Sequence, residues 1–201
     1  MIVIIDYGMG NLRSVQKAIE AVGSSAEITG DPDRVARASK VVLPGVGAFA
    51  DAMAELRRSG LDQAFHEAAR AGKPCLGVCL GLQLLFDESE EDGLHSGLGL
   101  FPGRIVRFTP RPGLKVPHMG WNSLRILQQA PLLAGLDPNP AVYFVHSYHA
   151  IAADHSLVAA ESDYPDPFPA VVWRDNITAC QFHPEKSQAV GLKMYANFVK
   201  P

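Results

Sequence analysis

The stretch Lys73–Phe86, KPCLGVCLGLQLLF, holds two of the three cysteines in the chain and sets one of them between glycines, as Gly77-Val78-Cys79-Leu80-Gly81. The short apolar run Cys75–Val78 is typical of a buried strand in a parallel sheet. A sharp turn from such a strand into a helix leaves no room for a Cβ atom beside its central residue. The two glycines therefore predict a tight strand-to-helix turn with Cys79 at its tip.

A cysteine at the tip of such a turn is well placed for nucleophilic chemistry. The turn holds the sulfur clear of the sheet and near the positive end of a helix, which favours the thiolate. The backbone amide of the next residue, Leu80, is then placed to stabilise an oxyanion. The alternative is a structural cysteine buried at a strand end. Cys75 and Cys180 lie inside apolar segments, so we interpret both as core residues.

The chain on the amino-terminal side of this stretch repeats the alternation of strand and helix. Three further short apolar segments predict strands: Ile2–Ile5, Ala26–Thr29 and Lys40–Leu43. Between them lie three helical patterns, residues 9–23, residues 31–39 and residues 48–71, the last with a break at Ser59-Gly60. This alternation predicts an α/β fold with an open, mostly parallel, doubly wound sheet and flanking helices. Ligands bind such sheets at the carboxyl ends of the strands, here residues 6–11, 44–49 and 78–81.

The second half of the chain has a different character. Residues 94–126 are rich in glycine and proline and contain short β-like pieces, and residues 141–150 predict one longer strand. Residues 156–182 predict a meander of three strands, and residues 187–200 predict an amphipathic closing helix. We therefore expect an added antiparallel strand region. No repeat or linker interrupts the chain, so a single domain over residues 1–201 is predicted.

Composition narrows the class of protein. The 201 residues are 47% hydrophobic and 19% charged, with a formal net charge of −3, which is an ordinary globular balance. Without a basic stripe, no nucleic-acid partner is expected. Three cysteines indicate reduced thiols rather than a disulfide scaffold, and the start of the chain lacks the features of a signal peptide. No run of 18 apolar residues exists, so no membrane contact is expected and a cytoplasmic location is predicted.

A catalytic cysteine needs a base that a third group orients. Among the seven histidines, only His183 has a carboxylate at a fixed short spacing, in Phe182-His183-Pro184-Glu185. The following proline keeps His183 extended, so Glu185 can reach the far imidazole nitrogen and fix the tautomer. The alternatives are a surface loop with a capping glutamate, or a zinc site built from both cysteines and His183. The order and spacing of those residues do not fit a zinc site, so no metal is expected.

The segments GVCLGLQLL and FHPEKS, in that order, resemble the class I (triad) glutamine amidotransferases. IIDYGMGNLRSV, LPGVGAF, PHMGWN and YFVHSYHA extend the resemblance from Met1 to the last helix. Within the family they are most similar to the branch of glutaminase subunits that serves histidine biosynthesis. The resemblance implies that Cys79 attacks the side-chain amide of L-glutamine and that a glutamyl thioester forms and is hydrolysed. It also implies that His183 moves the protons, that Glu185 orients His183 and that no cofactor takes part.

The resemblance also assigns residues around the triad. It implies an oxyanion hole made by the amides of Leu80 and Val46. It further implies five residues that bind the substrate: Gly47, Gln83, Glu91, Ser147 and Tyr148. Val46 stands between two glycines, which permit rotation of a peptide, whereas the β-branched Val46 resists some conformers. We hypothesise that the free chain holds this peptide in an inactive orientation and that a partner shifts it.

A partner is expected because the chain is too short to hold both a glutaminase and a domain that consumes ammonia. The resemblance implies a (β/α)8-barrel cyclase that receives ammonia through its interior. It also implies four interface residues: Asn11, Trp121, Tyr143 and Lys186. A core position for Trp121 is the alternative.

Other functions stay open on the sequence. The chain is alternatively a glutaminase for anthranilate, pyridoxal phosphate or nucleotide synthesis. A second alternative is a cysteine hydrolase or chaperone of another family that also places a cysteine at a tight strand-to-helix turn. A third is a binding module in which Cys79 is inert.

Overall fold

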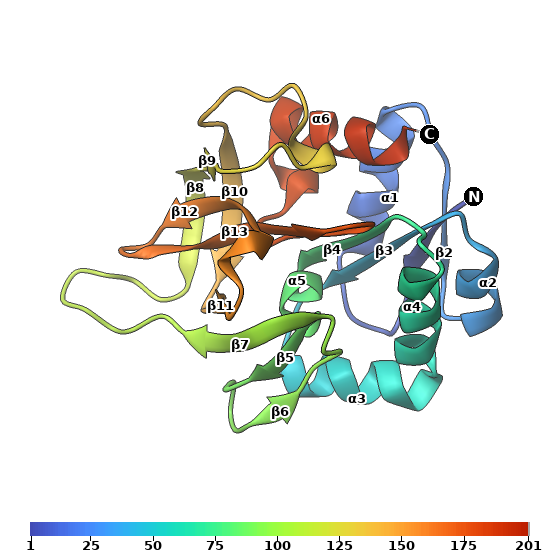
Figure 1. The fold of residues 1–201 in the computed structure, drawn as a ribbon, viewed down its shortest axis with the longest axis horizontal. Coiled ribbons are helices and arrows are strands. Elements are labelled where there is room, and N and C mark those ends of the chain that lie inside the picture. Colours follow the sequence, from blue (N-terminus) through green and yellow to red (C-terminus); the bar gives the residue numbers. More distant parts are fainter. Residues whose placement is uncertain (201) are drawn as a thin grey trace.

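An eight-stranded sheet with the strand order β2-β1-β3-β4-β14-β13-β12-β9 forms the centre of the fold (Figure 1). The computed structural model describes residues 1–200. Five strands are parallel: β2 (Ala26–Thr29), β1 (Ile2–Ile5), β3 (Lys40–Gly45), β4 (Cys75–Cys79) and β14 (Ile177–Cys180). Three antiparallel strands continue the sheet: β13 (Pro167–Arg174), β12 (Val158–Asp163) and β9 (Arg125–Ile126). The predicted open, mostly parallel sheet is confirmed.

Helices cover both faces of this sheet. The helices α1 (Leu12–Ala21) and α6 (Gln188–Val199) pack on one face, and α2 (Pro32–Arg37), α3 (Phe49–Ser59) and α4 (Leu61–Arg70) pack on the other. Alternate residues of β1 serve the two faces: Val3 lies in the hydrophobic cluster with α3, and Ile4 in the cluster with α1. A strand buried on both faces needs an unbroken apolar run, which is why Ile2–Ile5 has one.

Local signals set the ends of the helices as expected. The carboxylate of Asp31 accepts a hydrogen bond of 2.9 Å from the Asp33 amide at the start of α2. Gly60 adopts a left-handed conformation with φ 71° and separates α3 from α4, so the predicted break in the long helical region is confirmed.

The second half adds two small sheets beside the large one. A four-stranded sheet has the order β11 (Tyr148–Ala152), β7 (Phe101–Arg107), β5 (Phe86–Ser89) and β6 (His95–Ser96). A two-stranded sheet pairs β8 (His118–Ser123) with β10 (Ala141–His146). Residues 1–200 also contain three short 3-10 turns: η1 (Pro131–Leu133), η2 (His155–Leu157) and η3 (Pro184–Lys186).

The single strand predicted for residues 141–150 was wrong. The chain breaks at Ser147, so β10 and β11 belong to different sheets, β10 pairing with β8 and β11 with β7. The two residues at the break, Ser147 and Tyr148, line a pocket at the carboxyl ends of the parallel strands. The apolar pattern continues on both sides of Ser147, so the local sequence gives no sign that the strand ends there.

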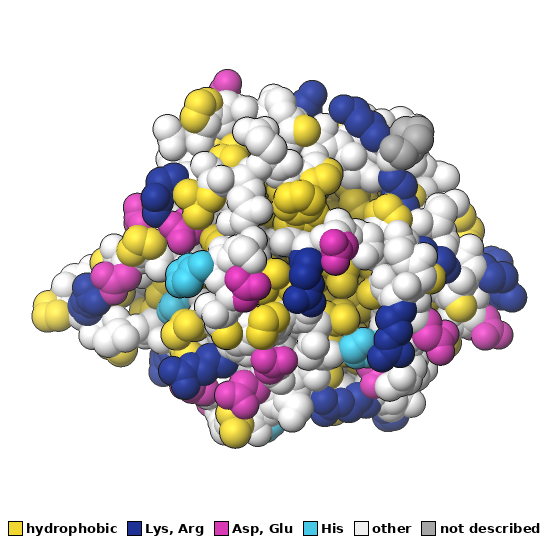
Figure 2. Space-filling view, in the orientation of Figure 1, with side chains coloured by type: hydrophobic (Ala, Val, Ile, Leu, Met, Phe, Trp, Pro, Cys, Tyr) yellow, Lys and Arg dark blue, Asp and Glu magenta, His cyan; other side chains and the backbone are white. Residues whose placement is uncertain are grey.

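Lys and Arg side chains are interspersed with Asp and Glu on the face shown in Figure 2, and no large field of one sign covers that face. Within residues 1–200, no helix has both the length and the apolar character needed to cross a bilayer.

Candidate active site

Cys79 lies at the tip of a tight turn between β4 and the short helix α5 (Leu80–Leu84), as the glycine pattern predicts. Its backbone has φ 56° and ψ −112°, a conformation that costs a non-glycine residue free energy and is typical of functional sites. A Cβ on Gly81 would lie 1.9 Å from the Leu43 carbonyl oxygen, and one on Gly77 would lie 2.9 Å from the Cβ of Ala179. Both glycines are therefore steric requirements of the turn.

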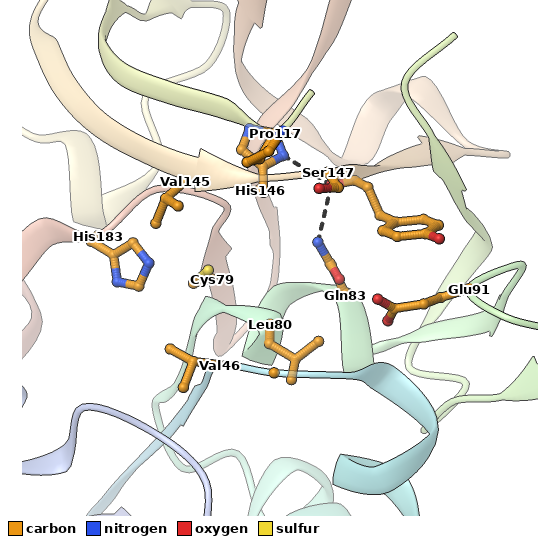
Figure 3. Close-up of a pocket in the computed structure, with 12 residues that line it drawn as sticks. Val46, Cys79, Leu80, Gln83, Glu91, Pro117, Val145, His146, Ser147 and His183 are labelled. Atoms are coloured by element: carbon orange, nitrogen blue, oxygen red, sulfur yellow. Dashed lines mark hydrogen bonds between the residues drawn. The ribbon is translucent and has the colours of Figure 1, made fainter. Parts of the chain in front are cut away.

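His183 lies beside Cys79 (Figure 3), just before η3 and close to the end of β14. Its Nδ1 donates to Glu185 Oε1 at 2.8 Å, and both side chains are buried. The hydroxyl of Tyr195 on α6 donates to Glu185 Oε2 at 3.5 Å. Nε2 of His183 is buried and has no hydrogen-bond partner within residues 1–200, so it is free to exchange a proton with a reacting group.

Burial and charge act in opposite directions on His183. Burial lowers its pKa, but the neighbouring Cys79 and Glu185 outweigh burial and raise the pKa to about 10. An imidazole with this proton affinity can accept the proton of a thiol as a general base and later donate it to a leaving group as a general acid.

The other two cysteines are buried thiols: Cys75 begins β4, and Cys180 lies on β14 beside Val78, next to the triad. Burial raises the pKa of the Cys75 thiol to about 12, and burial also raises the pKa of Cys180 well above its ordinary value. A thiol that stays protonated is a poor nucleophile. Among residues 1–200 no group of three or more His, Cys, Asp or Glu side chains is arranged to hold a metal ion.

A pocket of about 340 Å³ opens in front of Cys79 and His183 (Figure 3). The wall of this pocket contains every residue that the family resemblance assigns to the oxyanion hole or to substrate binding: Val46, Gly47, Leu80, Gln83, Glu91, Ser147 and Tyr148. They come from the loop after β3, from α5, from the β5–β6 connection and from the junction of β10 and β11, and these four segments meet only in the folded chain. The volume is in the range of small-ligand sites.

Two acceptor groups face each other in this pocket. Nε2 of Gln83 donates to the Tyr148 carbonyl at 3.0 Å and to Gln181 Oε1 at 3.1 Å, which leaves Oε1 of Gln83 free to accept. The Glu91 carboxylate lies next to Gln83 in Figure 3. Glu91 also accepts a hydrogen bond of 2.7 Å from the Phe49 amide at the start of α3. The pair therefore offers oxygen acceptors suited to an ammonium group.

A chain of buried histidines supports the Tyr148 carbonyl. His146 Nδ1 donates to that carbonyl at 2.8 Å, and because a carbonyl only accepts, His146 Nε2 is left to accept from His118 Nδ1 at 3.0 Å. Burial lowers the pKa of His118 to about 4 and that of His146 to about 3, so both are neutral.

Sequence reasoning did not find His118, His146, Gln181 or the pocket residues Pro117 and Val145. None of them has a local spacing that marks it, and only the pairing of β8 with β10 brings the two histidines together.

Three of the four residues expected at a partner interface, Trp121, Tyr143 and Lys186, lie together. Trp121 is 49% exposed, so it is not a core residue, and its ring contacts Tyr143 edge to face at 6.1 Å between centroids. Lys186 Nζ lies 6.0 Å from the Tyr143 ring centroid. Asn11 precedes α1, which packs against η3, and it accepts a hydrogen bond from the Ser14 hydroxyl at 2.8 Å. Val46, at 41% exposed, lies at the mouth of the pocket.

Comparison with known proteins agrees with this geometry. Residues 3–200 match the family model described as "Glutamine amidotransferase class-I". The chain is 58% identical to "Imidazole glycerol phosphate synthase subunit HisH" of Syntrophotalea carbinolica, with 98% of both chains covered. It is 52% identical to the protein of the same name from Geobacter sulfurreducens, over 98% of this chain and 97% of the relative.

Solved structures share the fold at low sequence identity. "Structure of PurLQS from Thermotoga maritima" aligns with a TM-score of 0.79 at 19% identity and covers 98% of this chain and 96% of that chain. The glutaminase domain of Trypanosoma brucei CTPS, with bound acivicin, aligns with a TM-score of 0.67 at 16% identity, over 98% and 92%. With a strained cysteine facing a histidine–glutamate pair and a family match across nearly its whole length, this chain belongs to the class-I glutamine amidotransferases.

Proposed function

We propose that this chain is the glutaminase subunit of imidazole glycerol phosphate synthase and hydrolyses L-glutamine to glutamate and ammonia. The observation that carries the proposal is Cys79 at the tip of its strained turn, with His183 beside it and Glu185 bound to the far nitrogen of His183. The high identity to relatives with that name supports the choice of pathway.

The geometry suggests how the triad performs the reaction. His183 takes the Cys79 proton, and the sulfur attacks the carboxamide carbon of glutamine, which places a negative charge on the carbonyl oxygen. The carbon–nitrogen bond then breaks, and the nitrogen leaves as ammonia with the proton from His183. Water, deprotonated by His183, attacks the resulting thioester, and the sulfur leaves and recovers its proton. Glu185 holds the imidazole and stabilises its charged form.

The oxyanion would be held by the backbone amides of Leu80 and Val46. Leu80 directly follows the nucleophile at the start of α5, and Val46 faces it from the end of β3 (Figure 3). Neither side chain takes part, so the chemistry depends on the backbone positions of two separate elements.

The substrate's amino-acid end would bind at the far end of the pocket. Its ammonium group would contact Gln83 Oε1 and the Glu91 carboxylate, which lie together there. Its carboxylate would contact the backbone of Ser147 and Tyr148, and Gly47 would leave room for the side chain. The hydrogen bonds of Gln83 and His146 to the Tyr148 carbonyl keep that wall in place.

Ammonia released here would pass to a (β/α)8-barrel cyclase docked over Asn11, Trp121, Tyr143 and Lys186. The exposed Trp121 packs against Tyr143, and aromatic side chains are enriched at the centres of interfaces; Lys186 Nζ lies over the Tyr143 ring. Val46 lies at the pocket mouth, where a docked partner would shift the peptide that carries the oxyanion donor. Residues 1–201 would act as one domain, with both hydrophobic clusters on the faces of one sheet.

The test is glutamate release by the chain with and without the cyclase and the cyclase's nucleotide ligand. We expect slow turnover alone, faster turnover in the complex, and none with Cys79→Ala. Cys75→Ala is the matched control, because Cys75 is buried four residues earlier in the same strand, and it should retain activity. Activity in Cys79→Ala would contradict the role of Cys79 as the nucleophile. Full activity without the cyclase would contradict the need for a partner.

The interface is tested by Trp121→Ala. Loss of a half-buried aromatic at an interface centre costs about 2 kcal/mol, or about 30-fold in Kd. Leu127→Ala, which removes another exposed apolar side chain just after β9, is the control and should bind normally. Titration calorimetry with the cyclase measures both, and unchanged affinity in Trp121→Ala would exclude this docking face.

A further inference from the structure

Tyr7 is a buried tyrosine just after β1, and the reaction described above does not use it. It is 4% exposed and packs in the hydrophobic cluster that contains Leu43 and Phe49. Its hydroxyl donates to the Pro44 carbonyl at 3.0 Å. Burial, with a smaller contribution from Cys79, raises the pKa of Tyr7 well above its ordinary value, so the hydroxyl remains a donor.

Pro44 is the second-last residue of β3 and is followed by the segment that carries the proposed oxyanion donor. Within residues 1–200, the amides of Val46 and Gly47 make no hydrogen bond to the protein. The next fixed point along the chain is the Phe49 amide, bound to Glu91. The Tyr7–Pro44 hydrogen bond is thus the last side-chain anchor before the free amides.

Tyr7 also lies close to Gly45, the residue just before Val46, and so does Leu80. A Cβ on Gly45 would lie 2.4 Å from the Tyr7 hydroxyl oxygen and 2.9 Å from Leu80 Cβ. The Tyr7 hydroxyl and Leu80 therefore meet at the face of Gly45 where a side chain would stand, and only a glycine fits there. The strand that leads to Val46 is pressed against the residue that supplies the other amide.

We propose that Tyr7 is a positioning residue for the oxyanion hole. Its hydroxyl, bound to the Pro44 carbonyl, holds the strand before Val46 at a fixed distance from the Leu80 amide. This inference rests on the proposed glutaminase function. Both donors must lie about 2.7–3.1 Å from the developing oxyanion, so a small shift of one strand weakens stabilisation of the transition state. Binding of ground-state glutamine, at the other end of the pocket, does not depend on that distance.

The variant Tyr7→Phe removes only the hydroxyl. In the complex with the cyclase we expect kcat to fall about tenfold or more, while KM for glutamine stays within about twofold. Ser162→Ala is the matched control, because its buried hydroxyl also donates to a backbone carbonyl, that of Ser123, and Ser162 does not line the pocket. Ser162→Ala should leave both constants unchanged.

Alkylation by iodoacetamide separates positioning of the oxyanion hole from damage to the nucleophile. The Cys79 sulfur, after giving its proton to His183, forms a bond to the CH2 carbon of iodoacetamide, and iodide leaves with the bonding electron pair, so no oxyanion develops. Mass spectrometry of the Cys79 peptide should show the same labelling rate in Tyr7→Phe as in the wild type. If labelling and kcat fall together, or if KM rises while kcat is kept, the inference is wrong.

Gly45→Ala gives a second measurement that needs no Tyr7 variant. Its methyl group would meet the Tyr7 hydroxyl and Leu80 and push the strand away, so kcat should fall while the labelling rate of Cys79 stays the same. Unchanged kcat in Gly45→Ala would overturn the inference. Wild-type complex without glutaminase activity would instead contradict the proposed function, and unchanged kcat in Tyr7→Phe contradicts only the role of Tyr7.

Discussion

At the scale of single residues, His183 shows how a buried base is tuned by two neighbours of different kinds. Burial alone would lower its pKa and make it a weak base. Glu185 and Cys79 reverse that effect, and the pKa rises to about 10. Glu185 is also held by Tyr195 of α6, so the closing helix takes part in fixing the orientation of the imidazole.

Glu185→Gln should test this tuning. The amide keeps the shape but removes the charge that stabilises the imidazolium, so we expect kcat to fall by about 100-fold or more. KM for glutamine should change little, because Glu185 does not line the pocket. Steady-state glutamate release in the complex measures both constants. Glu55→Gln, on the surface of α3, is the control, and a rise in KM at constant kcat would contradict an orienting role.

At the scale of elements, the turn between β4 and α5 is specified by steric exclusion more than by attraction. Gly81 sits against the Leu43 carbonyl of the neighbouring strand β3, so the helix can start only if position 81 has no side chain. The same close approach brings Leu80 beside the segment that leads to Val46. The close approach of position 81 to the β3 backbone is therefore the cause both of the compact turn and of the placement of Leu80 near Val46.

Gly81→Ala should destabilise the protein strongly. The new methyl group has no space against the β3 backbone, and overpacking of this kind costs about 3 kcal/mol or more. Gly72→Ala is the control: it has a positive φ of 73° but nothing within 4 Å of the added Cβ, so only the strain of about 1 kcal/mol remains. Urea unfolding compares the two, and similar losses would show that steric overlap is not the deciding cost.

At the scale of the whole molecule, buried histidines set how stability depends on pH. The folded pKa values of His118 and His146, about 4 and about 3, lie below the unfolded value of ~6.5. Their contribution to stability is present above pH ~6.5 and is lost as the pH falls toward 4. The folded pKa of His183, about 10, lies above the unfolded value, so its contribution is present below pH ~6.5 and is lost as the pH rises toward 10.

We therefore expect maximal stability near pH 6.5, with a decline on both sides. Each proton that the unfolded chain binds in excess changes the unfolding free energy by about 1.4 kcal/mol per pH unit. Urea unfolding at a series of pH values measures the slopes, and His146→Leu should reduce the slope on the acid side. His155→Gln, at an exposed position, should not alter it. If the unfolding free energy of His146→Leu falls with decreasing pH as steeply as that of the wild type, groups other than His146 cause the loss of stability in acid.

Much of this protein follows from short-range patterns in the sequence. The apolar run Ile2–Ile5, the cap at Asp31 and the break at Gly60 each act within a few residues, so they predict the parallel sheet and its helices. Gly77, Gly81 and the spacing of His183 and Glu185 are local features as well. They therefore predict the tight turn and the histidine–carboxylate pair from the sequence alone.

The tertiary structure alone decided what depends on contacts between distant segments. The break at Ser147 places β10 and β11 in different sheets, although the apolar pattern runs through it. The chain from His118 through His146 to the Tyr148 carbonyl exists only because β8 pairs with β10. The contact of Tyr7 with Pro44 likewise needs β1 beside β3. Hydrogen bonds between such segments leave no periodicity in the sequence, because their partners are chosen by the packing of the sheet and not by neighbours along the chain.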